Sequence, residues 1–131
     1  MSLLQTIHGE LRWLVALVAV AVIIKFLIGW LGKRQYAPID RTLLMAYTIL
    51  LDINVLLGLI ILLFGGGFNG PRLEHATTML LAAISGHMTT IWRKSSDSTT
   101  KYRNQLLLVL LSLVLVFFGV WRLRGSFISW P

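Results

Sequence analysis

The sequence contains no cysteine, and charged side chains are scarce in it. Without thiols the chain cannot form disulfide bonds, thiolate zinc sites or iron–sulfur clusters, and it has no cysteine nucleophile. Charged residues make up 13% of the 131 residues and hydrophobic residues make up 56%. The charged share is about half of that in an ordinary globular domain, so a water-soluble enzyme is not expected.

Acidic residues are the rarest charged type, with 5 Asp and Glu against 12 Lys and Arg, a formal net charge of +7. Nucleic acid is not an expected partner, because the apolar residues form long uninterrupted blocks instead of surrounding a basic face. Hydrolytic catalysis is not indicated either, since the GGGFNG segment lacks the Lys and Ser/Thr of a phosphate-binding loop. An electron-transfer or structural role is therefore favoured over a stand-alone enzyme.

Four long apolar blocks lie at about 12–31, 43–64, 75–92 and 105–121. Each approaches the length of about 20 residues that an α-helix needs to cross a bilayer. In lipid every backbone N–H and C=O must be satisfied within the segment, which favours helices over strands. Polar connections separate the blocks, and Asp40 is placed to cap the first turn of the second. The prediction is an all-α polytopic membrane protein, a four-transmembrane-helix bundle that forms one membrane domain over residues 1–131.

The positive charges are unevenly distributed between the two sides of this bundle. The first and third loops carry Lys33, Arg34, Arg41, Arg93, Lys94, Lys101 and Arg103, and the opposite side carries Arg12, Arg72, Arg122 and Arg124. Because short loops rich in Lys and Arg stay in the cytoplasm, this bias predicts a multi-pass protein of the bacterial inner membrane. Both termini are then outside the cytoplasm.

Three ionisable residues lie inside the predicted spans: Lys25, Asp52 and His87. At 1.5 Å per residue, all three lie roughly 18–20 Å from the same outer surface. Ionisable groups at such depth usually face the bundle interior. The structural interpretation is a Lys25–Asp52 ion pair with His87 as a further partner, and the alternative is a proton relay. The structural interpretation is preferred, because polar residues do not continue from this layer to both surfaces.

Small residues recur at every fourth position of the third span, at Thr78, Ala82 and Gly86. This spacing puts them on one helix face and predicts close packing against another helix. The fourth span is almost entirely aliphatic and aromatic, so it is expected to contact lipid or a partner subunit.

Two histidines, His8 and His75, lie at the outer ends of the first and third spans. Two neutral imidazoles on different helices can supply both axial ligands of a b-type haem. Arg12 follows His8 by four residues, Arg72 precedes His75 by three, and each could pair with a haem propionate. Met79 is a substitute ligand one turn beyond His75. Bacteriochlorophyll is another candidate occupant, and the alternative to any ligation is that both histidines contact water and lipid headgroups.

Four short segments carry a resemblance to a known family: IHGELRWLV, LDINVLLGLIILLF, RLEHATTML and RKSSDSTTKYRN. With them the chain resembles small bacterial four-helix membrane proteins described as cytochrome b-like. The resemblance implies haem b and electron transfer, with His8 and His75 at the positions of two family histidines. A third family histidine falls where this chain has Asp52, a poor haem ligand, so the resemblance implies no ligation from the second span.

The leading hypothesis is a small four-span subunit or accessory protein of a bacterial energy-converting membrane complex, respiratory or photosynthetic. It would bind a b-type haem near its outer face and transfer one electron at a time. A second hypothesis is a cofactor-free structural or assembly subunit that packs against larger membrane or pigment-binding proteins. Proton movement through the intramembrane polar layer is the third.

Overall fold

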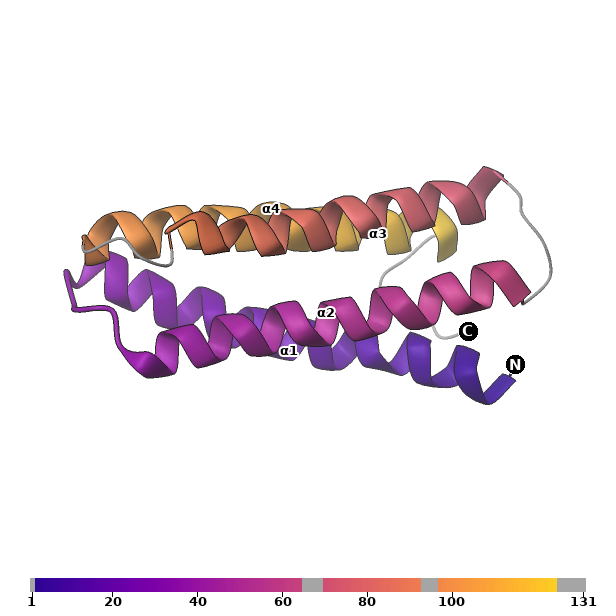
Figure 1. Ribbon diagram of the computed structural model, residues 1–131, viewed down its shortest axis with the longest axis horizontal. Coiled ribbons are helices and arrows are strands. Elements are labelled where there is room, and N and C mark those ends of the chain that lie inside the picture. The colour runs from indigo at the N-terminus through magenta and orange to yellow at the C-terminus, as the bar shows by residue number, and fades with distance from the viewer. Residues whose placement is uncertain (1, 65–69, 93–96, 125–131) are drawn as a thin grey trace.

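The computed structural model describes residues 2–64, 70–92 and 97–124, and these are almost entirely helical. The helices are α1 (Ser2–Leu31), α2 (Pro38–Phe64), α3 (Gly70–Met88) and α4 (Ser98–Arg124), and a short 3₁₀ helix, η1 (Thr89–Trp92), follows α3. Figure 1 shows the four α-helices lying along one common direction. The expected all-α class is confirmed.

The helices form a bundle in which α1 and α3 are diagonal to each other. Helix α1 packs against α2 and α4, and helix α3 packs against the same two neighbours. Among the described residues α1 and α3 make no direct helix–helix packing contact. Consecutive helices run in opposite directions along the common axis, as Figure 1 shows, which is the up-and-down arrangement of many four-helix bundles.

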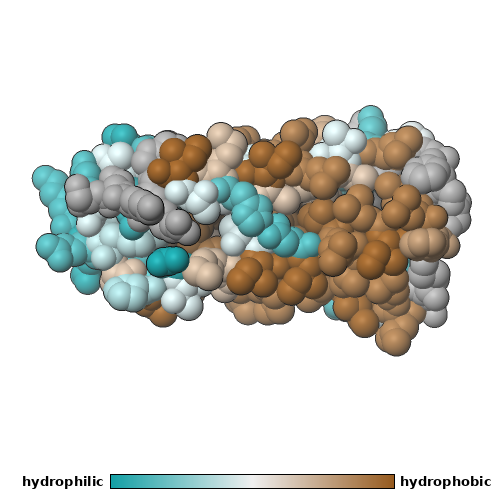
Figure 2. All heavy atoms as spheres, in the orientation of Figure 1, coloured by the Kyte–Doolittle hydropathy of each residue, from teal (hydrophilic) through white to brown (hydrophobic). Residues whose placement is uncertain are grey.

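Apolar side chains fill the centre of the bundle and also cover much of its outside. The core contains Val15, Val22 and Phe26 of α1 with Leu106 and Val109 of α4, all at most 1% exposed. Many large apolar side chains face outward on all four helices, and Figure 2 shows them covering one half of the visible face while the end where α1 leads into α2 is hydrophilic. Helices α1, α2 and α4 are long and apolar enough to cross a membrane, which makes the bundle compatible with a membrane protein.

The helices extend beyond the apolar blocks that hydropathy marks. Helix α1 begins ten residues before Arg12, and α4 begins at Ser98 instead of near Gln105. Asp97 explains the early start of α4, because its carboxylate accepts hydrogen bonds from the backbone N–H of Thr99 and the hydroxyl of Thr100. An acidic cap of this kind satisfies backbone donors that the helix itself leaves unpaired.

The expected third span does not continue as one α-helix to Trp92. It tightens into η1 after Met88, where the Thr89 hydroxyl donates to the carbonyl of Gly86 at 2.6 Å. The Gln105 amide on α4 donates to the Thr89 carbonyl at 3.0 Å. These bonds satisfy carbonyl groups at the end of α3, in the way that short 3₁₀ turns commonly finish α-helices.

Asp40 joins three helices through one fully buried carboxylate. Helix α2 begins at Pro38, so Asp40 lies within its first turn and not before it; its carboxylate accepts a hydrogen bond from the Ala37 N–H at 2.8 Å and so pairs a backbone donor at the helix start. Its other contacts are Lys25 Nζ of α1 at 2.7 Å and the Tyr102 hydroxyl of α4 at 2.5 Å. A buried charge costs several kcal/mol unless it is paired and hydrogen-bonded, and this carboxylate has all of these partners.

Gly29 of α1 and Ala82 of α3 each allow their helix to approach α4 closely. The Tyr102 ring lies over Gly29, where an added Cβ would come within 2.3 Å of Tyr102 Cζ. The small-residue face predicted on α3 also packs closely, since Ala82 is fully buried and its carbonyl accepts a hydrogen bond from Ser112 of α4 at 2.7 Å.

Replacing Gly29 by Ala is expected to destabilise the fold by about 1–3 kcal/mol, because the new methyl group overlaps the Tyr102 ring. Gly86→Ala is the matched control. A Cβ at Gly86 meets no side-chain atom closer than 3.5 Å, so this change should be neutral or stabilise by up to about 1 kcal/mol. Thermal unfolding in detergent, followed by circular dichroism, measures both. Equal effects of the two substitutions would contradict the proposed packing.

Candidate functional site

His8 and His75 meet across the centre of the bundle. Their ring centroids are 6.4 Å apart and the ring planes are 83° apart. The two residues come from α1 and α3, the diagonal helices, so their side chains reach past the neighbouring helices toward each other. The structure therefore brings together the two histidines that the sequence singled out.

Each imidazole lies against a glycine of a neighbouring helix. A Cβ at Gly58 of α2 would lie 2.9 Å from His8 Cε1, so a larger residue at this position would require the ring to shift. On the other side, His75 Nδ1 lies 3.1 Å from the carbonyl oxygen of Gly119 on α4. All four helices thus contribute to this end of the bundle.

The hydrogen bond to Gly119 determines which nitrogen of His75 carries the proton. A carbonyl oxygen can only accept, so Nδ1 must be the donor. In the neutral ring Nε2 then keeps its lone pair, which is the state that binds a metal ion. Histidines that ligate metals usually donate their other N–H to a carbonyl or carboxylate in this way.

The two rings are in edge-to-face contact, with a centroid distance of 6.4 Å. Neutral imidazoles are common metal ligands. Within residues 2–64, 70–92 and 97–124, no three His, Asp or Glu side chains gather into a possible metal site. Two imidazoles are a donor set that a haem iron can use.

Of the two arginines predicted near this site, Arg12 is buried, with 4% of its surface exposed. It lies one turn after His8 and donates a hydrogen bond to the Gly9 carbonyl at 2.7 Å. The side chain of Arg72 lies outside the described residues. Met79, the substitute ligand, is buried on α3 with its terminal methyl group close to Gly119.

The expected Lys25–Asp52 ion pair is not what the structure contains. Lys25 pairs with Asp40, and Asp52 Oδ2 lies 2.6 Å from His87 Nε2. Lys25 and His87 lie at different depths in the bundle. Lys25 follows His8 by 17 residues, whereas His87 follows His75 by 12, so Lys25 lies about 7 Å further from the histidine pair along the helix axis. Lys25 is therefore close enough to the hydrophilic end of the bundle to reach Asp40.

Asp52 and His87 form a pair on the seam between α2 and α3. Their side chains are 41% and 55% exposed, respectively. Figure 2 shows a hydrophilic streak on the face where α2 and α3 meet, extending toward the hydrophobic half of the molecule. The two members of the predicted polar layer on α2 and α3 are thus together, and Lys25 is not with them.

Sequence reasoning missed a polar cluster at the hydrophilic end. Here the Tyr36 hydroxyl donates to Gln105 Oε1 at 2.7 Å, and the Tyr36 ring lies 5.0 Å from that of Tyr102. Burial, followed by the nearby Asp40 carboxylate, raises the pKa of Tyr36 above its ordinary value, so the phenol remains a donor. The sequence contains three tyrosines, Tyr36 just before α2, Tyr47 within α2 and Tyr102 near the start of α4. Nothing in the sequence shows that Tyr36 and Tyr102 lie together.

Comparison with known proteins does not assign the chain to a family. No family model matches it, no curated protein matches it, and no solved structure matches it.

The hydrogen bond to Gly119 predicts that neutral His75 is protonated at Nδ1. Nitrogen-15 NMR of imidazole-labelled, cofactor-free protein distinguishes the two tautomers, and comparison with the His75→Gln variant assigns the signal. The His87→Gln variant should leave the His75 signal unchanged. A His75 ring protonated at Nε2 would contradict the proposed ligand geometry.

Proposed function

We propose that the protein is a small b-type cytochrome subunit that transfers electrons within a bacterial energy-converting membrane complex. The observation that supports this function best is the His8–His75 pair, with ring centroids 6.4 Å apart inside the bundle. The hydrogen bond from His75 Nδ1 to the Gly119 carbonyl adds to it, because a neutral ring protonated at Nδ1 carries its lone pair on Nε2, as metal-ligating histidines do.

The side chains around the pair have distinct roles in this proposal. His8 and His75 would hold the haem iron, and the Gly119 carbonyl would orient His75 and increase its basicity as a ligand. Gly58 gives the His8 ring its space. The buried guanidinium of Arg12, one turn along α1 from His8, is placed to neutralise a propionate. When bound, the haem supplies a reversible one-electron change at its iron.

The same proposal includes a four-span topology. Helices α1, α2 and α4 each have the length and hydropathy of a membrane span. Helix α3 is shorter and more polar, but it packs against α2 and α4 in the same bundle and carries outward-facing Leu80, Leu81 and Ile84. With the cation-rich loops inside, the His8–His75 pair lies near the outer face of the bacterial inner membrane.

Haem binding is tested by reduced-minus-oxidised difference spectra of protein purified from cells that make haem. The native chain should show a sharp α-band, and both His8→Ala and His75→Ala should abolish it, because each removes one axial ligand. His87→Ala is the matched control and should keep the band, since His87 pairs with Asp52 elsewhere in the bundle.

Absence of the α-band from the native chain supplied with haem would overturn the cytochrome proposal. So would a band that survives both ligand substitutions. In either case the structural hypothesis, a cofactor-free subunit that packs against larger membrane proteins, becomes the better account of the bundle and its exposed apolar faces.

Topology is tested by single-cysteine labelling, for which the cysteine-free chain is already suited. A cysteine at Thr6 should react with a membrane-impermeant maleimide in intact spheroplasts, because the N-terminal end lies outside. A cysteine at Gln35, in the exposed connection between α1 and α2, should react only after the membrane is permeabilised. The reverse pattern would contradict the proposed orientation, and protection of neither site would contradict the crossing of α1.

A further inference from the structure

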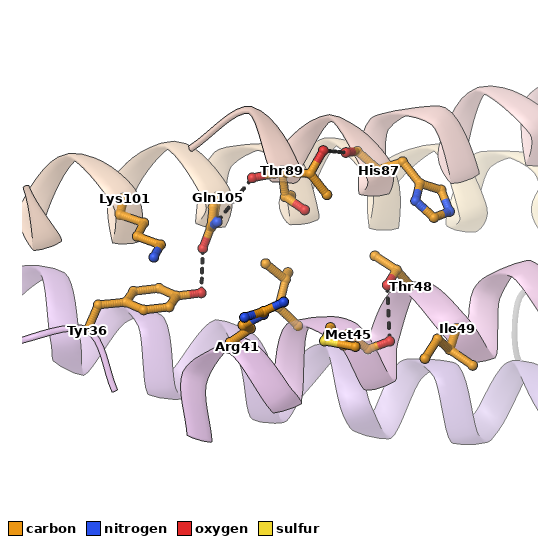
Figure 3. A pocket seen from close by; sticks show the side chains of 11 residues that line it. Tyr36, Arg41, Met45, Thr48, Ile49, His87, Thr89, Lys101 and Gln105 are labelled. Atoms are coloured by element: carbon orange, nitrogen blue, oxygen red, sulfur yellow. Dashed lines mark hydrogen bonds between the residues drawn. The ribbon is translucent and has the colours of Figure 1, made fainter. Parts of the chain in front are cut away.

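A cavity of about 260 Å³ lies between α2, the α3–η1 segment and α4 at the hydrophilic end of the bundle. The function proposed above does not use it. Figure 3 shows Tyr36, Lys101 and Gln105 at one end of this cavity and Ile49 and His87 at the other. The cavity therefore runs from the polar end of the bundle toward its apolar part.

Most polar groups of the wall already have hydrogen-bond partners within the protein. The hydroxyls of Thr48 and Thr90 donate to carbonyls of their own helical segments at 3.0 and 2.9 Å. The Gln105 amide is held between the Tyr36 hydroxyl and the Thr89 carbonyl. These groups form a fixed polar wall and need no ligand of their own.

The two cations of the lining, Arg41 and Lys101, are different. Neither forms an ion pair with a carboxylate in the part of the chain that the structure describes, and no Asp or Glu lines the cavity. Lys101 Nζ lies 4.0 Å from the centroid of the Tyr36 ring, which holds the ammonium over one end of the space. Two positive charges that face one concave surface attract an anion.

The rest of the wall is apolar and open to the outside of the bundle. Met45 and Ile49 follow Arg41 along the same side of α2 and are 47% and 50% exposed. Figure 3 shows them continuing along α2 from the guanidinium of Arg41. A ligand that fits this surface has an anionic head and an apolar chain.

The depth of the two cations agrees with such a ligand. Arg41 is the fourth residue of α2 and Lys101 is the fourth residue of α4, so both lie in the first helical turn at the same end of the bundle. In a membrane-spanning bundle this end lies at the interface, where the phosphates of lipid headgroups are found. Basic pockets between helices on the cytoplasmic side are known to bind lipid phosphates.

We propose that this cavity is a binding site for an anionic phospholipid, with the phosphate between Arg41 and Lys101 and an acyl chain along Met45 and Ile49. The cavity holds the headgroup region, and the acyl chains continue in the bilayer. The inference rests on the membrane embedding proposed above and is independent of haem, so a negative haem spectrum leaves it standing.

Native mass spectrometry of the full-length, delipidated protein in detergent measures the Kd for added phosphatidylglycerol and for phosphatidylcholine with the same acyl chains. We expect tighter binding of phosphatidylglycerol. Arg41→Gln and Lys101→Gln should each weaken it by about tenfold or more, since each removes a charged hydrogen-bond donor to the phosphate. Arg103→Gln is the matched control, because Arg103 is an exposed cation of α4 that does not line the cavity.

Equal Kd values for the two lipids, or an equal loss in Arg103→Gln, would overturn the proposal in favour of non-specific attraction to a basic surface. Inorganic phosphate is tested separately, and binding of phosphate as tight as that of the lipid would show a free-anion site instead. Arg41→Lys guards against an effect of misfolding: it keeps the positive charge and should retain the preference for phosphatidylglycerol. Loss of the preference in a folded Arg41→Lys variant would also count against phosphate binding by charge.

Discussion

The buried carboxylate of Asp40 is the interaction on which the arrangement of the hydrophilic end depends. One side chain pairs a backbone donor at the start of α2, pairs with Lys25 of α1 and accepts the Tyr102 hydroxyl of α4. Since an unpaired charge in this position would cost several kcal/mol, the three helices are held in one register relative to each other. The connection between α1 and α2, the close contact of Tyr102 with Gly29 and the position of Tyr36 all follow from that register.

The two ends of the bundle have different chemistry. One end contains two imidazoles, two glycines and a buried guanidinium, and we propose this set as a haem site. The other contains Arg41 and Lys101, which form no ion pair with any described carboxylate, at a cavity with a partly apolar wall that we propose as a lipid site. The apolar core between them separates the two sites, so that a substitution in one is not expected to affect ligand binding in the other.

The sequence allowed prediction of the helices and of the histidine pair, because hydropathy and the positions of residues at helix ends are local properties. It could not predict the partner of Lys25. That choice depends on how far α1 extends past Arg12 and on the placement of its end beside Asp40. The cavity could not be predicted from the sequence either, because it forms where α3 tightens into η1 and the Gln105 side chain of α4 donates to the Thr89 carbonyl. Such features depend on contacts between distant segments, which no single stretch of sequence contains.

The diagonal arrangement of α1 and α3 has a consequence for how the protein is assembled. His8 belongs to the first helical hairpin and His75 to the second, so the pair is complete only after both halves of the chain have been made and have associated. An ion or cofactor bound by both rings would connect the two helical hairpins. It would stabilise their association, and a ligand of higher affinity would stabilise it more. A ligand bound by both histidines would therefore mark a chain in which synthesis and helix association are complete.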